Sequence, residues 1–162
     1  GAGKTTLLKA IAGWSPADLR YDDGPAPDAL RRASTHLALH DSGPIAADWR
    51  RNLFAPDAAD DALWAALDAV DLADRAKDAG GRDAWIDPQA GLSLGERQRL
   101  NLARAWLRPC AIILLDEPGE HLDKTQGPAL LARLLDRLDD RVVVFATHDA
   151  ACAALAAETI RL

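Results

Sequence analysis

Apolar runs and helix-period patterns alternate along this chain. Two runs without strict alternation, 111–118 and 141–149, predict buried strands, and a shorter run at 35–40 predicts a third. Apolar residues at helical spacing predict helices over 60–70 and near 130–138. Strands that alternate with helices and lack a period of two are typical of a parallel sheet covered on both faces. The pattern therefore predicts an α/β fold.

The middle of the chain has a different character. Residues 46–108 lack apolar strand patterns, and we interpret them as a helical insertion between the core segments 1–45 and 109–162. Residues 15–34 are rich in Pro, Asp and Gly, which predicts a loop or a short hairpin. The last residues, TIRL (159–162), are compatible with the start of another strand.

Composition narrows the possible classes of protein. The chain is 49% hydrophobic and has a formal net charge of −6. It has no basic stripe typical of nucleic-acid binding, so we expect no nucleic-acid partner. No apolar run approaches the roughly 20 residues of a membrane-spanning helix. Cys110 and Cys152 lack metal-ligand or redox spacing, and we interpret them as buried, reduced thiols.

The chain opens with GAGKTT, which matches the end of a Walker A motif, G-x-x-x-x-G-K-[ST]. Gly1 and Gly3 would let backbone N–H groups turn toward phosphate oxygens, and the following helix would add its dipole. Lys4 would reach the β- and γ-phosphates of a nucleotide. The Thr5 hydroxyl, followed by Thr6, would ligate Mg²⁺. Taken alone, the stretch could also be a glycine-rich helix start with an exposed lysine.

Polar residues end both of the longer predicted strands. Asp116 and Glu117 follow IILL, and His148 follows VVVFAT. Ligands of α/β sheets bind at the carboxyl ends of strands. Adjacent carboxylates repel each other and are costly to bury, so a Mg²⁺–nucleotide would give this pair a role. Asp116 would hold Mg²⁺, and Glu117 would orient or deprotonate the attacking water. The alternative is a pair that is simply exposed to water.

These motifs resemble the nucleotide-binding domain of ATP-binding cassette (ABC) ATPases. The resemblance implies a P-loop NTPase fold, with a RecA-like parallel sheet and an inserted helical subdomain, that binds ATP and Mg²⁺. The landmarks follow the family's order over nearly the whole chain: Walker A at 1–6, a Q-loop at His40, the signature LSLGE at 92–96, Walker B at 112–116, the catalytic Glu117, a D-loop ending at Asp123, and the switch His148.

The resemblance also implies a partner. Two such domains would pair head to tail with two ATP molecules between them. The Ser93 hydroxyl and the Gly95 N–H of one domain would face the γ-phosphate bound by the other. Ser93 and Glu96 also form an S-x-x-E pattern, which predicts a capping box. Ser93 could therefore only cap its own helix, although the two roles are compatible.

The sequence departs from the family pattern in three ways. His40 stands where a glutamine is usual, which puts metal geometry and coupling to a membrane partner in doubt. Leu94 replaces a signature glycine. The first Walker A glycine would precede Gly1 by three positions. We therefore expect the chain to be a fragment that alone is poorly soluble and binds ATP weakly.

Three stretches resemble particular transporters. IAADWRRNLFAPD (45–57) resembles exporter-type ATPases, DEPGEHLD (116–123) resembles the ATPase halves of bacterial thiol exporters, and LSLGERQRL resembles peptide or fatty-acyl transporters. The resemblance implies ATP hydrolysis that powers transport, with a fused or separate transmembrane domain, at the cytoplasmic face of the cell membrane. There are two alternatives. One is a soluble ABC ATPase that acts in translation or on DNA. The other is a nucleotide-binding but inactive half of a heterodimer. The stretch from His40 to Ser93 is too short for the long coiled coil of chromosome ATPases.

Overall fold

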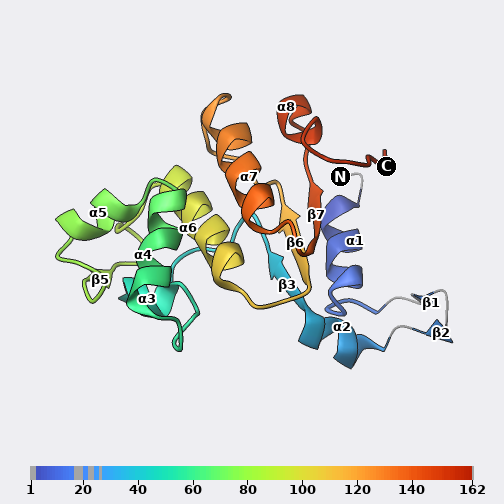
Figure 1. Cartoon of the computed structure of the whole chain (residues 1–162), viewed down its shortest axis with the longest axis horizontal. Coiled ribbons are helices and arrows are strands. Elements are labelled where there is room, and N and C mark those ends of the chain that lie inside the picture. The colour runs from blue at the N-terminus through green and yellow to red at the C-terminus, as the bar shows by residue number, and fades with distance from the viewer. Residues whose placement is uncertain (1–2, 17–19, 22–23, 26, 162) are drawn as a thin grey trace.

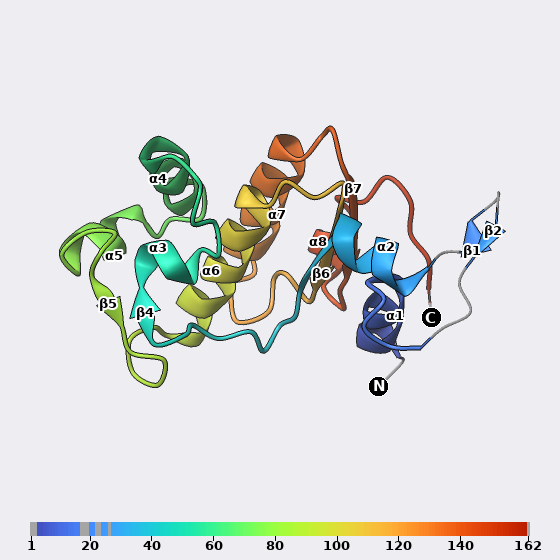
Figure 2. The same ribbon diagram turned by 90° about the horizontal axis from the view of Figure 1, so that it is seen from below.

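The computed structural model describes residues 3–16, 20–21, 24–25 and 27–161. A parallel sheet and its covering helices occupy one end of the molecule, and a mainly helical part occupies the other (Figures 1 and 2). The two termini lie at the sheet end (Figure 1).

The sheet has three parallel strands, with β6 in the middle. Its order is β3 (Thr35–Ala38), β6 (Ile112–Asp116) and β7 (Val142–Ala146). Thr35 pairs with Ile112, and Ile112 pairs with Val142. The carboxyl ends of all three strands therefore meet at one edge of the sheet. The parallel α/β fold predicted from the apolar runs is confirmed.

Successive residues of β6 enter two different cores. Ile113 and Leu115 belong to a large core on one face of the sheet. That core also includes side chains from α6 (Leu94–Leu107) and α7 (Gln126–Arg137). Leu114 packs on the other face, against Leu8 and Ala12 of α1 (Lys4–Ile11) and its C-cap. Each fully buried leucine stabilises the fold by about 1.5–3 kcal/mol.

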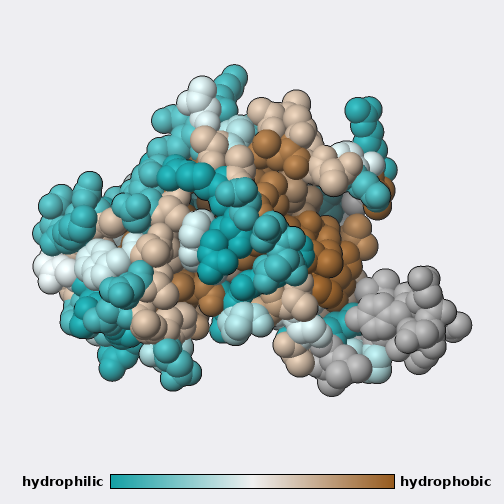
Figure 3. All heavy atoms as spheres, in the orientation of Figure 1, coloured by the Kyte–Doolittle hydropathy of each residue, from teal (hydrophilic) through white to brown (hydrophobic). Residues whose placement is uncertain are grey.

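The sequence predicted a sheet that is covered on both faces, but strand β7 is partly exposed. Val142 and Val144 are 59% and 36% exposed, and apolar side chains gather where β7 and α1 lie in Figure 3. The prediction is wrong here because, among the described residues, β7 pairs with β6 alone. The short α8 (Ala150–Ala153) follows β7. The suggested strand at TIRL is also wrong: residues 159–161 form none, and Ile160 is 87% exposed rather than packed.

The segment after α1 forms a hairpin, as predicted, and then a helix that the sequence did not predict. The hairpin pairs β1 (Arg20–Tyr21) with β2 (Gly24–Pro25) in antiparallel fashion. Helix α2 (Asp28–Ser34) then leads into β3. Pro27 directly precedes α2, where its missing N–H leaves no helical hydrogen bond unmade.

The elements between β3 and β6 are mainly helical. Leu63, Ala66 and Leu67 are almost fully buried, as the pattern over 60–70 predicted. Two-residue strands, absent from the sequence prediction, pair in antiparallel fashion beside the helices. The elements of this part before α6 are β4 (Ala47–Asp48), α3 (Trp49–Asn52), α4 (Asp60–Ala69), α5 (Ala73–Asp78) and β5 (Trp85–Ile86).

A buried arginine joins this helical part to the segment that follows β3. Arg104 of α6 is 3% exposed, and burial lowers its pKa to about 10, so it is still charged at neutral pH. Its guanidinium donates to the Asn52 carbonyl at 2.7 Å, to Asn101 Oδ1 at 2.8 Å and to the Gly43 carbonyl at 3.2 Å. Asn101 Nδ2 in turn donates to the Leu39 carbonyl at 3.3 Å. Helix α6 therefore holds the chain on both sides of position 40.

We expect Arg104→Ala to destabilise the fold by about 3 kcal/mol or more. Each buried acceptor left without its donor costs about 1–3 kcal/mol. The matched control is Arg51→Ala, since Arg51 is exposed and its ion pair with Asp48 is worth at most about 1 kcal/mol. Urea unfolding curves of both variants measure the difference. Equal midpoints for the two variants would show that the buried network contributes nothing.

Candidate functional site

The start of α1 and the carboxyl ends of the three sheet strands converge on one cluster of side chains. Gly3 stands at the N-cap of α1 with φ 79°, a left-handed conformation that suits glycine. Lys4 and Thr5 follow in the first turn, and Thr6 beside them is exposed. Gly1 was predicted as part of this loop and lies outside the described residues.

The first half of the cluster surrounds one oxygen of Asp116. This carboxylate ends β6 and is 2% exposed. Asp116 Oδ2 accepts a hydrogen bond from Thr5 Oγ1 at 2.7 Å and lies 3.2 Å from His40 Nδ1. The hydrogen bond to Asp116 raises the pKa of His40, with burial acting more weakly in the opposite direction. A hydroxyl beside a buried carboxylate suits a hard divalent cation such as Mg²⁺.

The second half of the cluster surrounds Glu117. Lys4 Nζ donates to Glu117 Oε1 at 2.7 Å. Glu117 Oε2 accepts from the His148 backbone N–H at 3.1 Å and lies 2.9 Å from His148 Nδ1. Burial alone would raise the pKa of Glu117, but the hydrogen bonds from Lys4 and His148 outweigh it and lower the pKa. Glu117 is therefore ionised at neutral pH.

The backbone at Glu117 is strained. Its φ of 48° lies in the left-handed region, which costs a non-glycine residue about 1–3 kcal/mol. Its N–H donates to the Ala146 carbonyl at 2.8 Å, which ties it to the end of β7. Gln98 Nε2 donates to the Glu117 carbonyl at 3.1 Å from α6. These two contacts hold the backbone of Glu117 in place, and its side chain contacts both Lys4 and His148.

Gln98 is a site residue that sequence reasoning missed. It is 3% exposed, as are Asn101 and Arg104, and the three stand at intervals of three along α6. They form a polar stripe on the buried face of the helix. This regular spacing on one helix face could have identified them from the sequence, because buried polar side chains need hydrogen-bond partners.

The signature residues do not join this cluster within one chain. Ser93 is the exposed N-cap of α6, and both its N–H and its hydroxyl donate to the Glu96 carboxylate. The Glu96 N–H donates back to Ser93 Oγ at 3.3 Å, which confirms the predicted capping box. Gly95 lies so close to the loop after β6 that an added Cβ would stand 3.0 Å from the His121 carbonyl. Asp123 is exposed in the same loop, shortly before α7.

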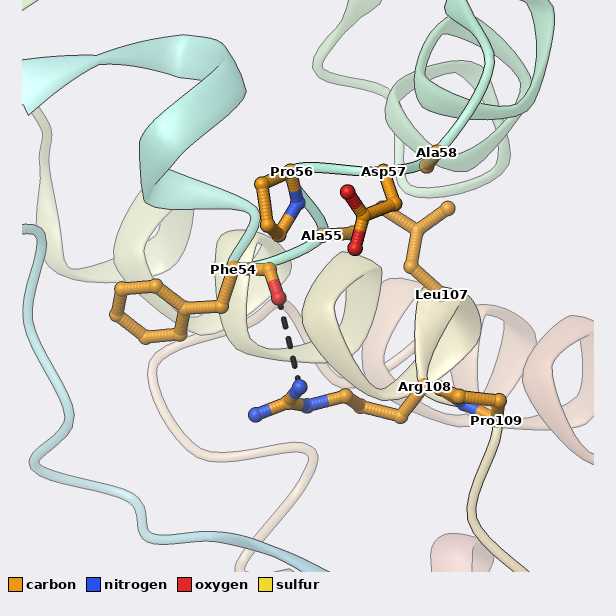
Figure 4. A pocket seen from close by; sticks show the side chains of 8 residues that line it. All are labelled: Phe54, Ala55, Pro56, Asp57, Ala58, Leu107, Arg108 and Pro109. Carbon is orange, nitrogen blue, oxygen red and sulfur yellow. Dashed lines mark hydrogen bonds between the residues drawn. The ribbon is translucent and has the colours of Figure 1, made fainter.

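A separate pocket lies away from these residues. It is formed by the turn between α3 and α4 and the end of α6, where Arg108 donates to the Phe54 carbonyl at 3.4 Å (Figure 4). Its lining includes none of the predicted site residues: Phe54, Ala55, Pro56, Asp57, Ala58, Leu107, Arg108 and Pro109. We therefore expect the functional site at the carboxyl ends of the sheet strands rather than in this pocket.

A lysine and a threonine at a helix start, opposite carboxylates at the ends of parallel strands, define a P-loop nucleotide-binding domain. The family model for the ABC transporter matches residues 1–120. The chain therefore belongs to the ABC transporter family and has the fold and motifs of its ATPase domains.

Its relatives include transport proteins of several kinds. It is 32% identical over 157 residues to the Escherichia coli (strain K12) glutathione/L-cysteine transport system ATP-binding/permease protein CydC, a match that covers 91% of this chain and 27% of CydC. It is 37% identical over 169 residues to the Xanthomonas axonopodis pv. citri (strain 306) aliphatic sulfonates import ATP-binding protein SsuB 2, which covers 99% and 54%. It therefore spans about half or less of the length of these relatives.

A solved structure has the same fold. A bacterial Atm1-family ABC exporter with ATP bound superposes with a TM-score of 0.76 and 23% identity, over 91% of this chain and 28% of the exporter chain. Among the described residues, no helix has the length and apolar character needed to cross a membrane.

Proposed function

We propose that this chain binds ATP with a divalent cation and hydrolyses the γ-phosphate bond. The observation that carries this proposal is the paired contact of Lys4 with Glu117 and of Thr5 with Asp116, across the gap between α1 and β6. Phosphate oxygens would replace the Glu117 carboxylate as the partner of Lys4. Backbone N–H groups at the start of α1 would receive the remaining phosphate charge.

Each polar group then has a distinct task. Thr5 and Asp116 would hold Mg²⁺, which neutralises phosphate charge when bound. Glu117, released from Lys4, would accept a proton from the attacking water or orient it. His148 already lies against Glu117 and would hold that carboxylate in place and contact the γ-phosphate.

The signature would act in a second copy or a related domain. Because Ser93 is exposed and its hydroxyl pairs with Glu96 rather than with Lys4 or Glu117, we propose that it completes the nucleotide site of the paired domain. Gly95 would contribute its N–H, and Glu96 would keep Ser93 at the N-cap. Residues 46–108 would serve as the helical subdomain that presents this end of α6. Asp123, in the loop that contacts Gly95, would lie at the same interface.

We further propose that the ATPase powers an exporter for small thiols, with a transmembrane domain fused or separate, at the cytoplasmic face of the membrane. The likeness to CydC supports this reading, together with the segments 45–57 and 116–123. The likeness to proteins named for aliphatic sulfonate import favours import as the alternative. Uptake or release of labelled cysteine and sulfonate by vesicles containing the full-length protein distinguishes the two.

Replacing Lys4 tests nucleotide binding directly. We expect Lys4→Ala to weaken binding of a fluorescent ATP analogue by about tenfold to hundredfold, since a charged hydrogen bond contributes about 1.5–3 kcal/mol. Lys9→Ala, on the last turn of the same helix, is the matched control and should bind as the wild type does. Unchanged affinity in Lys4→Ala would contradict the proposed nucleotide site.

A further inference from the structure

A negative charge stands beside the hydroxyl that is proposed to meet the partner's nucleotide. Glu96 Oε2 accepts from the Ser93 N–H at 2.8 Å and from Ser93 Oγ at 2.7 Å. Burial alone would raise the pKa of Glu96, but the hydrogen bonds from Ser93 and the charges of Arg75 and Arg99 outweigh it and lower the pKa. Glu96 is therefore ionised at neutral pH. A γ-phosphate that reached Ser93 would approach this carboxylate, and two negative charges at short range repel each other.

Arg75 of α5 supplies the opposite charge. Its Nε lies 3.3 Å from Glu96 Oε1, the carboxylate oxygen on the side away from the Ser93 hydrogen bonds. Its Nη2 donates to the Gly91 carbonyl at 3.1 Å. One guanidinium therefore contacts both the carboxylate in the first turn of α6 and the loop that leads into this helix.

The loop before Ser93 also has a support that does not involve α5. Arg97 of α6 donates from Nε to the Leu92 carbonyl and from Nη2 to the Pro88 carbonyl, each at 3.1 Å. Because Arg97 holds this loop from its own helix, loss of Arg75 should leave the shape of the loop largely intact. We therefore expect the main contribution of Arg75 to be its charge beside Glu96.

We propose that Arg75 is a positioning residue of the shared nucleotide site, which neutralises Glu96 so that the start of α6 can accept the γ-phosphate of the paired domain. With this counter-ion in place, the N–H groups and the dipole of α6 face the phosphate without an opposing net charge. The inference rests on the proposed function and deepens it, because it names a residue of another helix on which ATP-driven pairing depends.

Cross-linking of paired domains at increasing ATP concentration, in the full-length protein, tests this role. Arg75→Ala should raise the ATP concentration for half-maximal pairing by about fivefold to tenfold, because an ion pair that is weak in water becomes stronger once the paired domains exclude solvent. Arg75→Lys keeps the charge and should recover most of the pairing. Salt at 1 M screens charges beyond about 3 Å, so the defect of Arg75→Ala should shrink there, whereas the loss of a purely structural contact would not be relieved.

The matched control is Lys77→Ala, which removes a positive charge from the same helix. Lys77 donates to Asp74 at 3.0 Å, and this variant should pair as the wild type does. A second background isolates the charge of Glu96. When Glu96→Gln is already present there is no carboxylate to neutralise, so adding Arg75→Ala should change the half-maximal ATP concentration by less than about twofold.

Two results would overturn this inference alone. One is pairing of Arg75→Ala at the level of Lys77→Ala, in a protein whose pairing Ser93→Arg abolishes. The other is an equal defect of Arg75→Ala with and without Glu96→Gln. If instead the wild type does not pair with ATP, or Ser93→Arg pairs as the wild type does, the proposed shared site itself fails. Thermal unfolding of each variant, measured beside pairing, separates a pairing defect from loss of the fold.

Discussion

Glu117→Gln is expected to lower the rate of ATP hydrolysis by about 10²–10⁴-fold, the contribution of a positioned general base. Nucleotide binding should persist or become tighter. In the structure the Glu117 carboxylate forms a 2.7 Å ion pair with Lys4. The neutral amide of glutamine would hold Lys4 less strongly, so the lysine would be more available to phosphate. The variant should therefore accumulate with ATP bound and its domains paired.

Phosphate release by the full-length protein measures the rate, and a fluorescent ATP analogue measures binding. Glu120→Gln is the matched control, because Glu120 lies three residues further on in the same loop and its N–H donates to the Glu117 carbonyl. This control should hydrolyse ATP at nearly the wild-type rate. Wild-type turnover in Glu117→Gln would remove Glu117 from the catalytic role.

Ser93→Arg is expected to abolish ATP-driven pairing of the domains without weakening nucleotide binding to a single domain. Ser93 is exposed at the start of α6, and an arginine there would fill the space that the γ-phosphate of the partner's nucleotide needs. Binding should be unaffected because none of the hydrogen bonds of Ser93 reaches Lys4 or Glu117 in the described chain.

Ser93→Ala separates pairing from capping. Loss of the cap costs about 1 kcal/mol of stability in either variant, since neither alanine nor arginine is a favoured N-cap residue. The alanine variant lacks the bulk of arginine and should still pair, although more weakly. Cross-linking of paired domains with ATP present, measured beside thermal unfolding, distinguishes the two effects. Pairing of Ser93→Arg at the wild-type level would leave Ser93 with a capping role alone.

Much of the framework follows from local sequence. The strand IILLD and the capping box at Ser93 are where the pattern placed them, because apolar runs and cap residues act within a few positions. The sequence also placed Lys4 at a helix start and Asp116 and His148 after predicted strands. A parallel sheet then brings strand ends together whatever the loops between them contain.

The remaining features depend on which segments become neighbours. The contact of His40 with Asp116 requires β3 to pair with β6, and no local pattern specifies that pairing. The Gln98 contact with the Glu117 carbonyl likewise requires α6 to pack beside the end of β6. The apolar run that contains Val144 predicts a buried strand. Val144 is nevertheless exposed, because among the described residues β7 has a neighbouring strand on one side alone.

In the proposed pair of domains, Lys4 of one domain and Ser93 of the other enclose the same nucleotide. Orthovanadate can replace the released phosphate beside bound ADP, and ultraviolet light then cleaves the backbone next to the trapped vanadate. In the full-length protein incubated with ATP, a divalent metal and vanadate, fragment masses should show cleavage both beside Lys4 and beside Ser93. Cleavage beside Lys4 with none at Ser93 would show that the signature does not complete the site, and would contradict the account.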